Sequence, residues 1–283
     1  MMYECKVKNH NGEELNLSTS SKYTLYKITG LQPPASAVNK SNNATSDGVT
    51  INSVRVGERN IVLYVALEGD VETNRIELYK YFPLKQTVTI YFKNGQRDVY
   101  IKGKVETFNC DPFTKKQVAQ ISIICPQPYF KAINDMVSHF SDVSSVFQFP
   151  LSIPESGIEF SAITNNIRKS IVNEGNVATG IIIELSAIGT VVNPIIYDVL
   201  KRTHIKLMLT MEANDRIIIN TNLGEKSITL VRNGVSTNIM GYMFPTSSWL
   251  TLESGDNVFT YDCESGGSNI QISFTTSILY GGV

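Results

Sequence analysis

The chain has no closely spaced pair of cysteines. Its four cysteines, Cys5, Cys110, Cys125 and Cys263, lie far apart among 283 residues. A structural zinc site or a redox motif requires two cysteines a few residues apart, so the sequence predicts neither. We expect free thiols in a protein that folds in a reducing compartment.

Long apolar runs and an excess of charge of either sign are also missing. No apolar stretch approaches the roughly 18 residues that a membrane-spanning helix needs. The chain does not open with the basic and then apolar segments of a signal peptide. The formal net charge is -1 and only 18% of the residues are charged, whereas a nucleic-acid-binding domain usually has an excess of Lys and Arg. We therefore expect neither a membrane nor a nucleic acid as a partner.

Residues arranged for catalysis or cofactor binding are not recognisable. The three histidines, His10, His139 and His204, stand alone in the sequence, and no nucleophile elbow, phosphate-binding loop or dinucleotide-binding fingerprint occurs. Asp256 and Asp262 lack the spacing of an EF-hand calcium loop, so we interpret them as turn residues. We expect no enzyme activity, no cofactor and no metal, and a hydrolase is the alternative with the least support.

The residues that are present favour β structure. Hydrophobic residues make up 42% of the chain, which is enough for a core, and β-branched residues are frequent. From Asp47 to Glu106 the pattern is strand, strand, short helix, strand, strand. These strands are expected at Thr50–Val56, Arg59–Leu67, Thr87–Lys93 and Asp98–Val105, and the last two are joined across the hairpin signal Asn94-Gly95.

The middle of this block combines a buried strand with a short helix. Arg59–Leu67 is apolar on both faces, which predicts burial on both sides. Thr73 or Asn74 is a candidate helix cap, Glu77 completes a capping box, and Pro83 ends the helix. One face of the helix carries apolar residues at a spacing of three: Ile76, Tyr79 and Phe82.

Two further segments of the first half are distinctive. Ala35–Ser46 is polar, with clusters of Asn and Ser, and is expected to be an exposed loop or arm. Tyr129–Phe140 carries a continuous apolar stripe and is predicted to be a helix. The stripe consists of Phe130, Ile133, Met136, Val137 and Phe140. Additional strands are expected at Tyr3–Asn9, Tyr23–Thr29 and Gln117–Cys125.

The chain is expected to form two domains. Ser141–Pro154 has two prolines and little periodicity, so we place the first domain at residues 1–140, a linker at 141–157 and the second domain at 158–283. After Ile158, short strands alternate with Gly or Asn turns, as in a β-sandwich or jelly roll. The predicted fold class is therefore mainly β: a sandwich-like first domain with a short helix and a hairpin, followed by a β-sandwich. The sequence leaves open whether the last strand, Ile270–Leu279, stays in the second domain or crosses back to the first.

Two sets of residues are candidates for contacts with other molecules. Arg55, Arg59, Arg75 and Lys93 lie in the central β block, where they either form a solvated face or pair with acidic residues of a neighbouring subunit. Trp249 either packs in the second domain or is exposed and stacks on a sugar ring. The exposed arrangement makes a carbohydrate-binding β-sandwich module for host-surface attachment the alternative function.

A series of short segments runs through the chain in a distinctive order. In the first half they are Tyr26–Leu31 with Pro33-Pro34, Asp47-Gly48, Arg59–Leu63, Leu78–Leu84 and Val99–Val105. In the second half they are Glu174–Thr179, Asp215–Asn220, Trp249–Leu252 and Gly255–Asn257. Their order and spacing resemble those of the phage distal tail proteins, the tail-hub family called Dit.

The resemblance implies a structural hub. Proteins of that family assemble through the N-terminal domain into a six-fold ring below the tail tube, and a galectin-like β-sandwich forms the peripheral C-terminal domain. The ring joins the tube to tail-tip or baseplate proteins, including the tail-associated spike or lysin and the receptor-binding proteins. The protein would then be a homohexamer in the virion tail, assembled in the host cytoplasm. The His, Asn and Arg set of true galectins is not recognisable around Trp249, so docking of partner proteins is favoured over sugar binding.

Overall fold

The computed structural model describes residues 3–43, 46–144, 162–165 and 168–283. The chain divides into two compact units, the first made of Met1–Ile133 with Leu279–Val283 and the second of Asn134–Ile278. The chain therefore passes from one unit to the other twice, and the second unit is an insertion in the first. In the described part of the chain, no helix is both long and apolar enough to cross a membrane.

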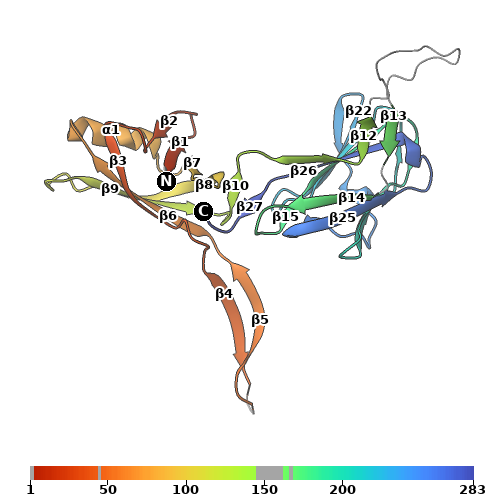
Figure 1. Cartoon of the computed structure of the whole chain (residues 1–283), viewed down its shortest axis with the longest axis horizontal. Coiled ribbons are helices and arrows are strands. Elements are labelled where there is room, and N and C mark those ends of the chain that lie inside the picture. The colour runs from red at the N-terminus through yellow and green to blue at the C-terminus, as the bar shows by residue number, and fades with distance from the viewer. Residues whose placement is uncertain (1–2, 44–45, 145–161, 166–167) are drawn as a thin grey trace, which may run out of the picture. The chain divides into compact units, whose positions relative to one another are not determined.

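A nine-stranded sheet forms the first unit (Figure 1). Its strands are β1 (Glu4–Lys8), β2 (Glu14–Asn16), β3 (Tyr23–Thr29), β6 (Arg59–Leu67), β7 (Thr87–Lys93), β8 (Asp98–Asn109), β9 (Val118–Cys125), β10 (Phe130–Ala132) and β27 (Leu279–Tyr280). The main path runs in the order β2-β1-β7-β8-β9-β6-β3, while β10 pairs with both β8 and β27. A hairpin of β4 (Ser36–Asn42) and β5 (Val49–Val56) forms a separate two-stranded sheet.

The core of the first unit lies on one face of this sheet because its strands alternate between buried and less buried residues. In β6, Ile61, Leu63 and Val65 are fully buried, whereas Val62 and Tyr64 on the other face are partly exposed. The strand predicted to be buried on both faces is thus completely buried on one face and covered incompletely on the other.

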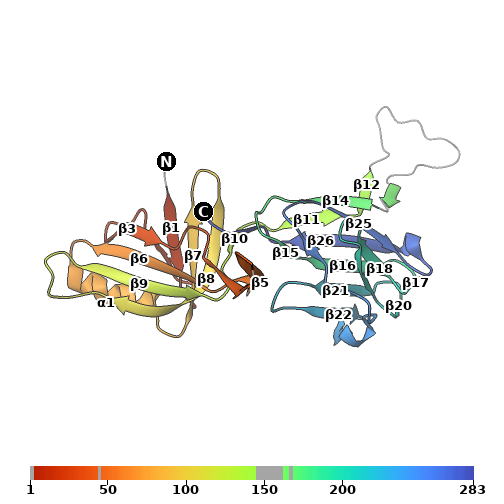
Figure 2. The same cartoon turned by 90° about the horizontal axis from the view of Figure 1, so that it is seen from below.

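The helix α1 (Val71–Tyr81) lies beside this sheet (Figure 2). It begins after Asp70, whose side chain accepts a hydrogen bond from the backbone nitrogen of Thr73 at 3.4 Å. The cap is therefore earlier than the expected Thr73 or Asn74. Asn74 is buried, and its side-chain nitrogen donates to the carbonyl oxygen of Glu68 at 2.7 Å, so it ties the helix to the preceding loop.

The buried face of α1 differs from the apolar face that the sequence suggests. In α1, Asn74 and Leu78 are buried, whereas Ile76 and Tyr79 of the expected face are exposed. The third residue of that face, Phe82, follows the helix and is buried as expected. Residues four apart stay on one side of an α-helix, while residues three apart drift around it. The buried positions at a spacing of four include the polar Asn74, so the apolar pattern was right for Phe82 and wrong for Ile76 and Tyr79.

The second unit is an antiparallel β-sandwich. One sheet has six strands in the order β11-β26-β16-β21-β22-β23 and the other has four in the order β14-β25-β18-β19. The six are β11 (Met136–His139), β26 (Ile270–Thr276), β16 (Ile182–Ala187), β21 (Arg216–Asn220), β22 (Ser227–Arg232) and β23 (Val235–Asn238). The four are β14 (Arg168–Asn173), β25 (Gly255–Asp262), β18 (Ile195–Asp198) and β19 (Thr203–Lys206). Both sheets contribute to one core, with Ile183 and Phe274 from the first and Ile196 and Phe259 from the second.

Short pairs of strands and two 3-10 turns complete the second unit. The pairs are β12 (Ser141–Ser144) with β13 (Ala162–Asn165), β15 (Thr179–Gly180) with β24 (Thr251–Leu252), and β17 (Val191–Val192) with β20 (Thr210–Met211). The turns are η1 (Met240–Tyr242) and η2 (Gly267–Asn269). The mainly β fold class predicted from the sequence is confirmed.

Residues 129–140 do not form the predicted helix and instead provide the strands β10 and β11. β10 pairs with β8 and β27 in the first unit, and β11 pairs with β26 in the second. Phe130 and Phe140 are buried, but Ile133 and Val137 are 46% and 56% exposed. The prediction was wrong because hydrogen bonding to distant strands overrides a local periodic pattern, especially in a segment that passes between two units.

The division of the chain differs from the expected domain limits. It falls after Ile133 rather than within residues 141–157. Of the expected linker, residues 141–144 form β12 and residues 145–157 lie outside the described part of the chain. The question about the last strand also has an answer: β26 stays in the second unit, and β27 crosses back to the first.

Leu63 offers a test of the first core. We expect Leu63→Ala to lower the free energy of unfolding by about 2–5 kcal/mol, because its fully buried side chain would leave a cavity. Val38→Ala, on the exposed hairpin, is the control and should change it by less than about 0.5 kcal/mol in the isolated chain. Urea denaturation followed by circular dichroism compares the two, and equal midpoints would show that β6 is not a core strand.

All four cysteines are free, and two of them are buried. Burial raises the pKa of the thiols of Cys5 and Cys125 to about 12, and it also raises the pKa values of Cys110 and Cys263. At pH 8, a thiol with that pKa is thiolate in only about one molecule in ten thousand. We expect iodoacetamide to label Cys110 and Cys263 first and the other two only in denaturant, as mass spectrometry can measure. Equal rates in the native protein would contradict the burial of β1 and β9.

Candidate functional site

A hairpin, here called the arm, projects from the first unit (Figure 1). It consists of β4 and β5, which pair with each other and with no other described strand. All residues of β4 are exposed, and so are all residues of β5 except the half-buried Val56. The segment expected as a loop or arm, Ala35–Ser46, therefore belongs to an arm. Its residues Ser36–Asn42 form one strand of a ribbon that packs against nothing in the described part of its own chain.

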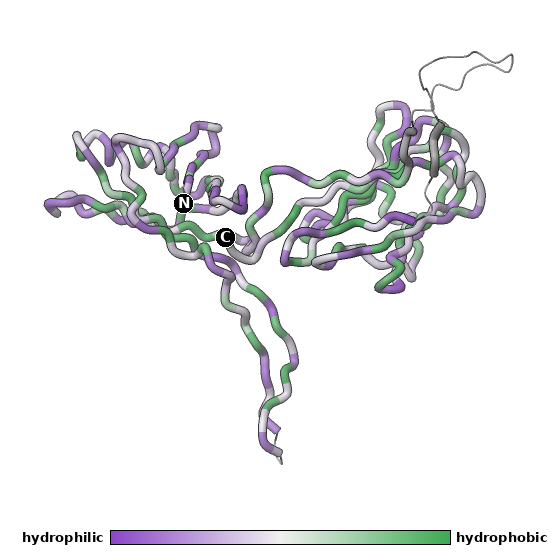
Figure 3. The backbone as a smooth tube through the Cα atoms, viewed as in Figure 1, coloured by the Kyte–Doolittle hydropathy of each residue, from purple (hydrophilic) through white to green (hydrophobic). Residues whose placement is uncertain are grey.

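The two faces of the arm have different polarity. Directly paired residues of a ribbon point to the same face, and the register pairs Val38 with Val54 and Lys40 with Ile51. Apolar side chains gather on this face: Val38, Val49, Ile51, Val54 and Val56. The opposite face carries Ala37, Asn39, Ser41, Thr50, Ser53 and Arg55. Figure 3 shows hydrophobic and hydrophilic residues alternating along the arm.

A register shift keeps the apolar residues together. Between Asn39 and Lys40 the pairing skips Asn52, so this residue has no partner opposite it. One extra residue in a strand is a β-bulge, and it changes the phase of alternation. Without it, Ile51 and Val54, which are an odd number of positions apart, would point to opposite faces. The apolar face was not recognised from the sequence, although alternation after the turn Asp47-Gly48 was a signal for it.

The base of the arm is held by a buried arginine. Arg59 is only 2% exposed, and its guanidinium donates four hydrogen bonds to carbonyl oxygens. Nε donates to Pro128 at 2.5 Å, and Nη2 donates to Gly281 at 2.5 Å. Nη1 donates to Gly30 at 2.5 Å and to Gln32 at 2.8 Å. One side chain therefore joins the segment that leads into the arm, the segment that leads into β10, and the C-terminal segment.

Gly30 permits this close packing. It has a φ of +88°, a conformation that residues with a side chain rarely adopt. A Cβ atom at this position would lie 2.1 Å from the carbonyl oxygen of Asn60. Only glycine therefore lets β3 end against β6 at the point where the chain turns toward the arm.

The C-terminal segment has further contacts in the first unit. The backbone nitrogen of Val283 donates to the carbonyl oxygen of Leu31 at 3.0 Å. Arg97 donates to the carbonyl oxygen of Gly282, and its guanidinium lies 4.4 Å from the centroid of the Tyr280 ring. The last residues of the chain are thus built into the same region that supports the arm.

The basic residues expected at a subunit interface lie on four different elements. Arg55 is exposed on the polar face of the arm. Arg59 is in the interior, so the expectation that it contacts another subunit is corrected: its guanidinium donors are used within its own chain. Arg75 lies 2.5 Å from Glu72 on the same helix, and Lys93 lies 3.3 Å from Asp98 across the β7–β8 hairpin. The structure does not bring the four together.

Trp249 is half-buried in the second unit and packs against its core. The ammonium group of Lys226 lies 5.4 Å from the centroid of its ring. A sugar would stack on the face of an exposed aromatic ring, but here a cation lies over the ring. The surroundings of Trp249 therefore give no specific support to a sugar site.

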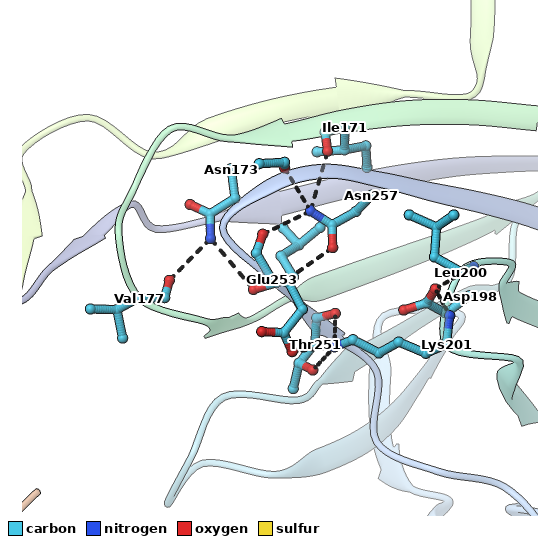
Figure 4. A network of polar contacts seen from close by, with 11 residues as sticks. Ile171, Asn173, Val177, Asp198, Leu200, Lys201, Thr251, Glu253 and Asn257 are labelled. Carbon is cyan, nitrogen blue, oxygen red and sulfur yellow. Dashed lines mark hydrogen bonds and ion pairs between the residues drawn. The ribbon is translucent and has the colours of Figure 1, made fainter.

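Polar side chains in the second unit mainly fix loops (Figure 4). The side-chain nitrogen of Asn257 donates to the carbonyl oxygen of Glu253 at 2.9 Å, and its oxygen accepts from the Glu253 backbone nitrogen at 2.8 Å. Asn173 donates to the carbonyl oxygen of Val177 at 3.1 Å. Lys201 lies 2.6 Å from the carboxylate of Glu253. These buried amides replace backbone partners in turns, which is a structural use of polar groups.

A catalytic or metal centre is not evident in what the structure describes. Among residues 3–43, 46–144, 162–165 and 168–283, no three His, Cys, Asp or Glu side chains come together as a group that could hold a metal ion. The feature that requires a functional explanation is the arm, because it exposes an apolar face that the described part of its own chain leaves uncovered.

Comparisons with known proteins agree with a tail component. Residues 10–125 match the family model described as the phage tail protein RIFT-related domain. Residues 174–277 match the model described as the siphovirus-type tail component, C-terminal domain. No curated protein matches the chain.

Solved structures share the fold of nearly the whole chain. The Dit protein of phage SPP1, described as a paradigm of the hub adsorption apparatus in phages that infect Gram-positive bacteria, has a TM-score of 0.68 at 12% identity, covering 96% of this chain and 98% of its own. A chain of the phage P2 baseplate in its activated conformation with Ca has a TM-score of 0.51 at 11% identity, covering 98% of both chains. The corresponding structure with Sr gives 0.50 at 12% identity, again covering 98% of both.

The two family models match the two units in turn, and together they span most of the chain. The fold of the SPP1 protein extends across both units and across the residues between the two matches. The chain therefore belongs to the siphovirus-type phage tail components, in the Dit family of distal tail proteins.

Proposed function

We propose that the protein forms a closed ring of six copies that joins the tail tube to the tail-tip and receptor-binding proteins. As a Dit family member it is a structural component of the phage tail and so of the virion. The ring and its partners are the proposal. The observation that carries it is the arm, whose apolar face is not covered by any described residue of its own chain.

The arm has the properties of a segment that is completed by a neighbour. An isolated two-stranded ribbon is at best marginally stable in water, and neither outer edge of the arm pairs with another strand that the structure describes. Fully burying one exposed Val or Ile side chain stabilises by about 1.5–3 kcal/mol. Val38, Val49, Ile51 and Val54 are 46–61% exposed, so an interface would supply about half of that for each of them. Covering the apolar face by a neighbouring copy would therefore stabilise the arm.

The charges on the first unit add specificity to such a contact. In the described part of the chain, Arg55 has no acidic partner, and it lies on the polar face of the arm. We propose that it pairs with an acidic side chain of the next copy. An exposed ion pair contributes only about 0.2–1 kcal/mol, so it would orient the arm while the apolar face supplies most of the affinity. Lys93 and Arg75, which already have partners in their own chain, would lie at the margin of the interface.

The second unit would occupy the periphery of the ring and dock other baseplate proteins. We infer that it is the galectin-like domain expected from the resemblance, with the tail-associated spike or lysin and the receptor-binding proteins as partners of the complete hub. Assembly would take place in the host cytoplasm. Sugar binding remains the alternative, and isothermal titration with host-wall saccharides on wild type and Trp249→Ala tests it.

Electron microscopy of the purified protein, with multi-angle light scattering, tests the ring. We expect six-fold rings and a mass six times that of one chain, with the proportion of rings rising with protein concentration. Monomers alone at high concentration, together with tail particles that show no ring of this protein, would refute the proposal.

A further inference from the structure

The first unit has an open groove of about 610 Å³ between the start of β1 and β3. Its lining is largely apolar and includes Tyr3, Leu25, Tyr26, Ile28, Leu31 and Phe92. Leu25, Ile28 and Leu31 also pack against the core of the unit. The groove is therefore a depression with a firm apolar floor rather than a gap between loose loops.

One wall of the groove is a free strand edge. β3 is the last strand in the order β2-β1-β7-β8-β9-β6-β3, and in the described residues it pairs only with β6. Its outer edge is open to a further strand, the mode of binding called β-augmentation. β3 is seven residues long, and the arm strands β4 and β5 are seven and eight residues long, so the free edge and the ribbon have matching lengths.

Tyr26 marks the lip of the groove. The pairing of β3 with β6 shifts between Leu25 and Lys27, which leaves Tyr26 without a partner and 74% exposed. A bulge of this kind redirects a side chain away from the sheet. Exposed tyrosines beside apolar depressions are frequent anchors in protein interfaces, because they bury a large ring and lose little rotamer freedom.

We propose that the groove receives the arm of a second copy of this chain, with the apolar face of the arm against the groove floor and one arm strand along the free edge of β3. This inference rests on the proposed ring and names the surface that completes it. Groove and arm are complementary in polarity and length, and each has an unpaired strand edge. The arm of the same chain extends away from the sheet of the first unit (Figure 1), so the arm that fills the groove would come from a neighbouring copy.

The geometry also explains how a ring would close. The residues that end the groove, Gly30 to Gln32, lead directly into the arm at Ser36. Each copy would thus receive one arm at the point from which it extends its own. Such a head-to-tail contact uses two different surfaces of the same chain and forms a ring when the rotation between copies closes. Arg59 fixes the start of the arm and the end of the groove together through Gly30 and Gln32.

Disulfide trapping between two variants tests the contact. Both carry Cys5→Ala, because Cys5 also lines the groove, together with Cys110→Ser and Cys263→Ser, which leaves only the buried Cys125. One variant adds Tyr26→Cys in the groove, and the other adds Val54→Cys on the apolar face of the arm. When the two variants are mixed, assembled and oxidised, the mixture should give at least tenfold more cross-linked dimer than either variant alone. Ser53→Cys, on the opposite face of the arm, is the matched control and should cross-link at least fivefold less than Val54→Cys.

The outcomes separate this inference from the proposed ring. Rings in the microscope with no dimer above the background, or with equal dimer from the Ser53→Cys variant, would overturn the arm-in-groove contact and leave the ring standing. Failure of the wild-type protein and of the tail particles to show rings would overturn both. Dimer from the Val54→Cys mixture alone, in preparations that contain rings, is the result that we expect.

Discussion

Replacing Val38 and Val54 by serine should abolish ring formation and leave the single chain folded. Both side chains are about half exposed in the chain itself, at 46% and 57%, so the free energy of unfolding of the monomer should change by less than about 0.5 kcal/mol. Full burial of an exposed Val contributes about 1.5–3 kcal/mol, and about half of each side chain is left for an interface to cover. Losing two would weaken each contact by roughly 1.5–3 kcal/mol, which is about ten- to a hundredfold in the association constant.

The matched control changes the same number of residues on the other face of the arm. Asn39→Ala and Ser53→Ala lie on the polar face and remove no apolar surface. Light scattering and electron microscopy of the two double variants at equal concentration give the comparison, with circular dichroism to verify folding. Rings that persist in the serine variant, or that vanish equally in the alanine variant, would show that the apolar face of the arm does not hold subunits together.

Arg59→Met should destabilise the first unit by about 3–5 kcal/mol. Methionine replaces much of the apolar stem of the side chain but removes the donors for four carbonyl oxygens, those of Gly30, Gln32, Pro128 and Gly281. A buried acceptor that loses its donor costs about 1–3 kcal/mol. Water can reach some of these oxygens in part, so the total loss of stability should be smaller than the sum of four such costs.

The change should appear in particular backbone amides. The protein has one tryptophan, Trp249, and it reports on the second unit, so hydrogen exchange by mass spectrometry is the better measurement for the first. We expect faster exchange in residues 279–283 and at the base of the arm, with the second unit unchanged. Arg97→Met, which removes a bond only to Gly282 and a contact with Tyr280, should have an effect of about 1 kcal/mol. Equal effects of the two substitutions would contradict the central role of Arg59.

Sequence patterns predicted the elements that are fixed by local chemistry. The strands at Arg59–Leu67, Thr87–Lys93 and Gln117–Cys125 were recognised from their alternation, and the hairpin at Asn94-Gly95 from its turn residues. The predicted family is confirmed by the two family models and the shared fold. The proposed interface was predicted only in part. The sequence indicated that the arm is exposed, but its division into an apolar and a polar face depends on a bulge that the sequence does not reveal.

Arg59 shows why the remainder could not be predicted. An arginine at the start of a strand is ordinarily solvated or paired with an acid, and no local pattern indicates that four carbonyl oxygens from distant parts of the chain converge on it. Residues 129–140 also could not be predicted from local pattern, because the spacing of their apolar residues is compatible with a helix and with two strands. The available partners, β8, β27 and β26, decided the outcome.

The sequence by itself determined that this protein is built from short antiparallel strands, with an exposed polar segment before residue 47 and a sandwich in its second half. Tertiary structure alone decided that the C-terminus returns to the first unit, that Arg59 is buried there, and which face of the arm is apolar. The physical reason is that the periodicity of side chains along the chain indicates which residues favour burial. It carries no information on which distant backbone supplies their hydrogen bonds or covers their surface.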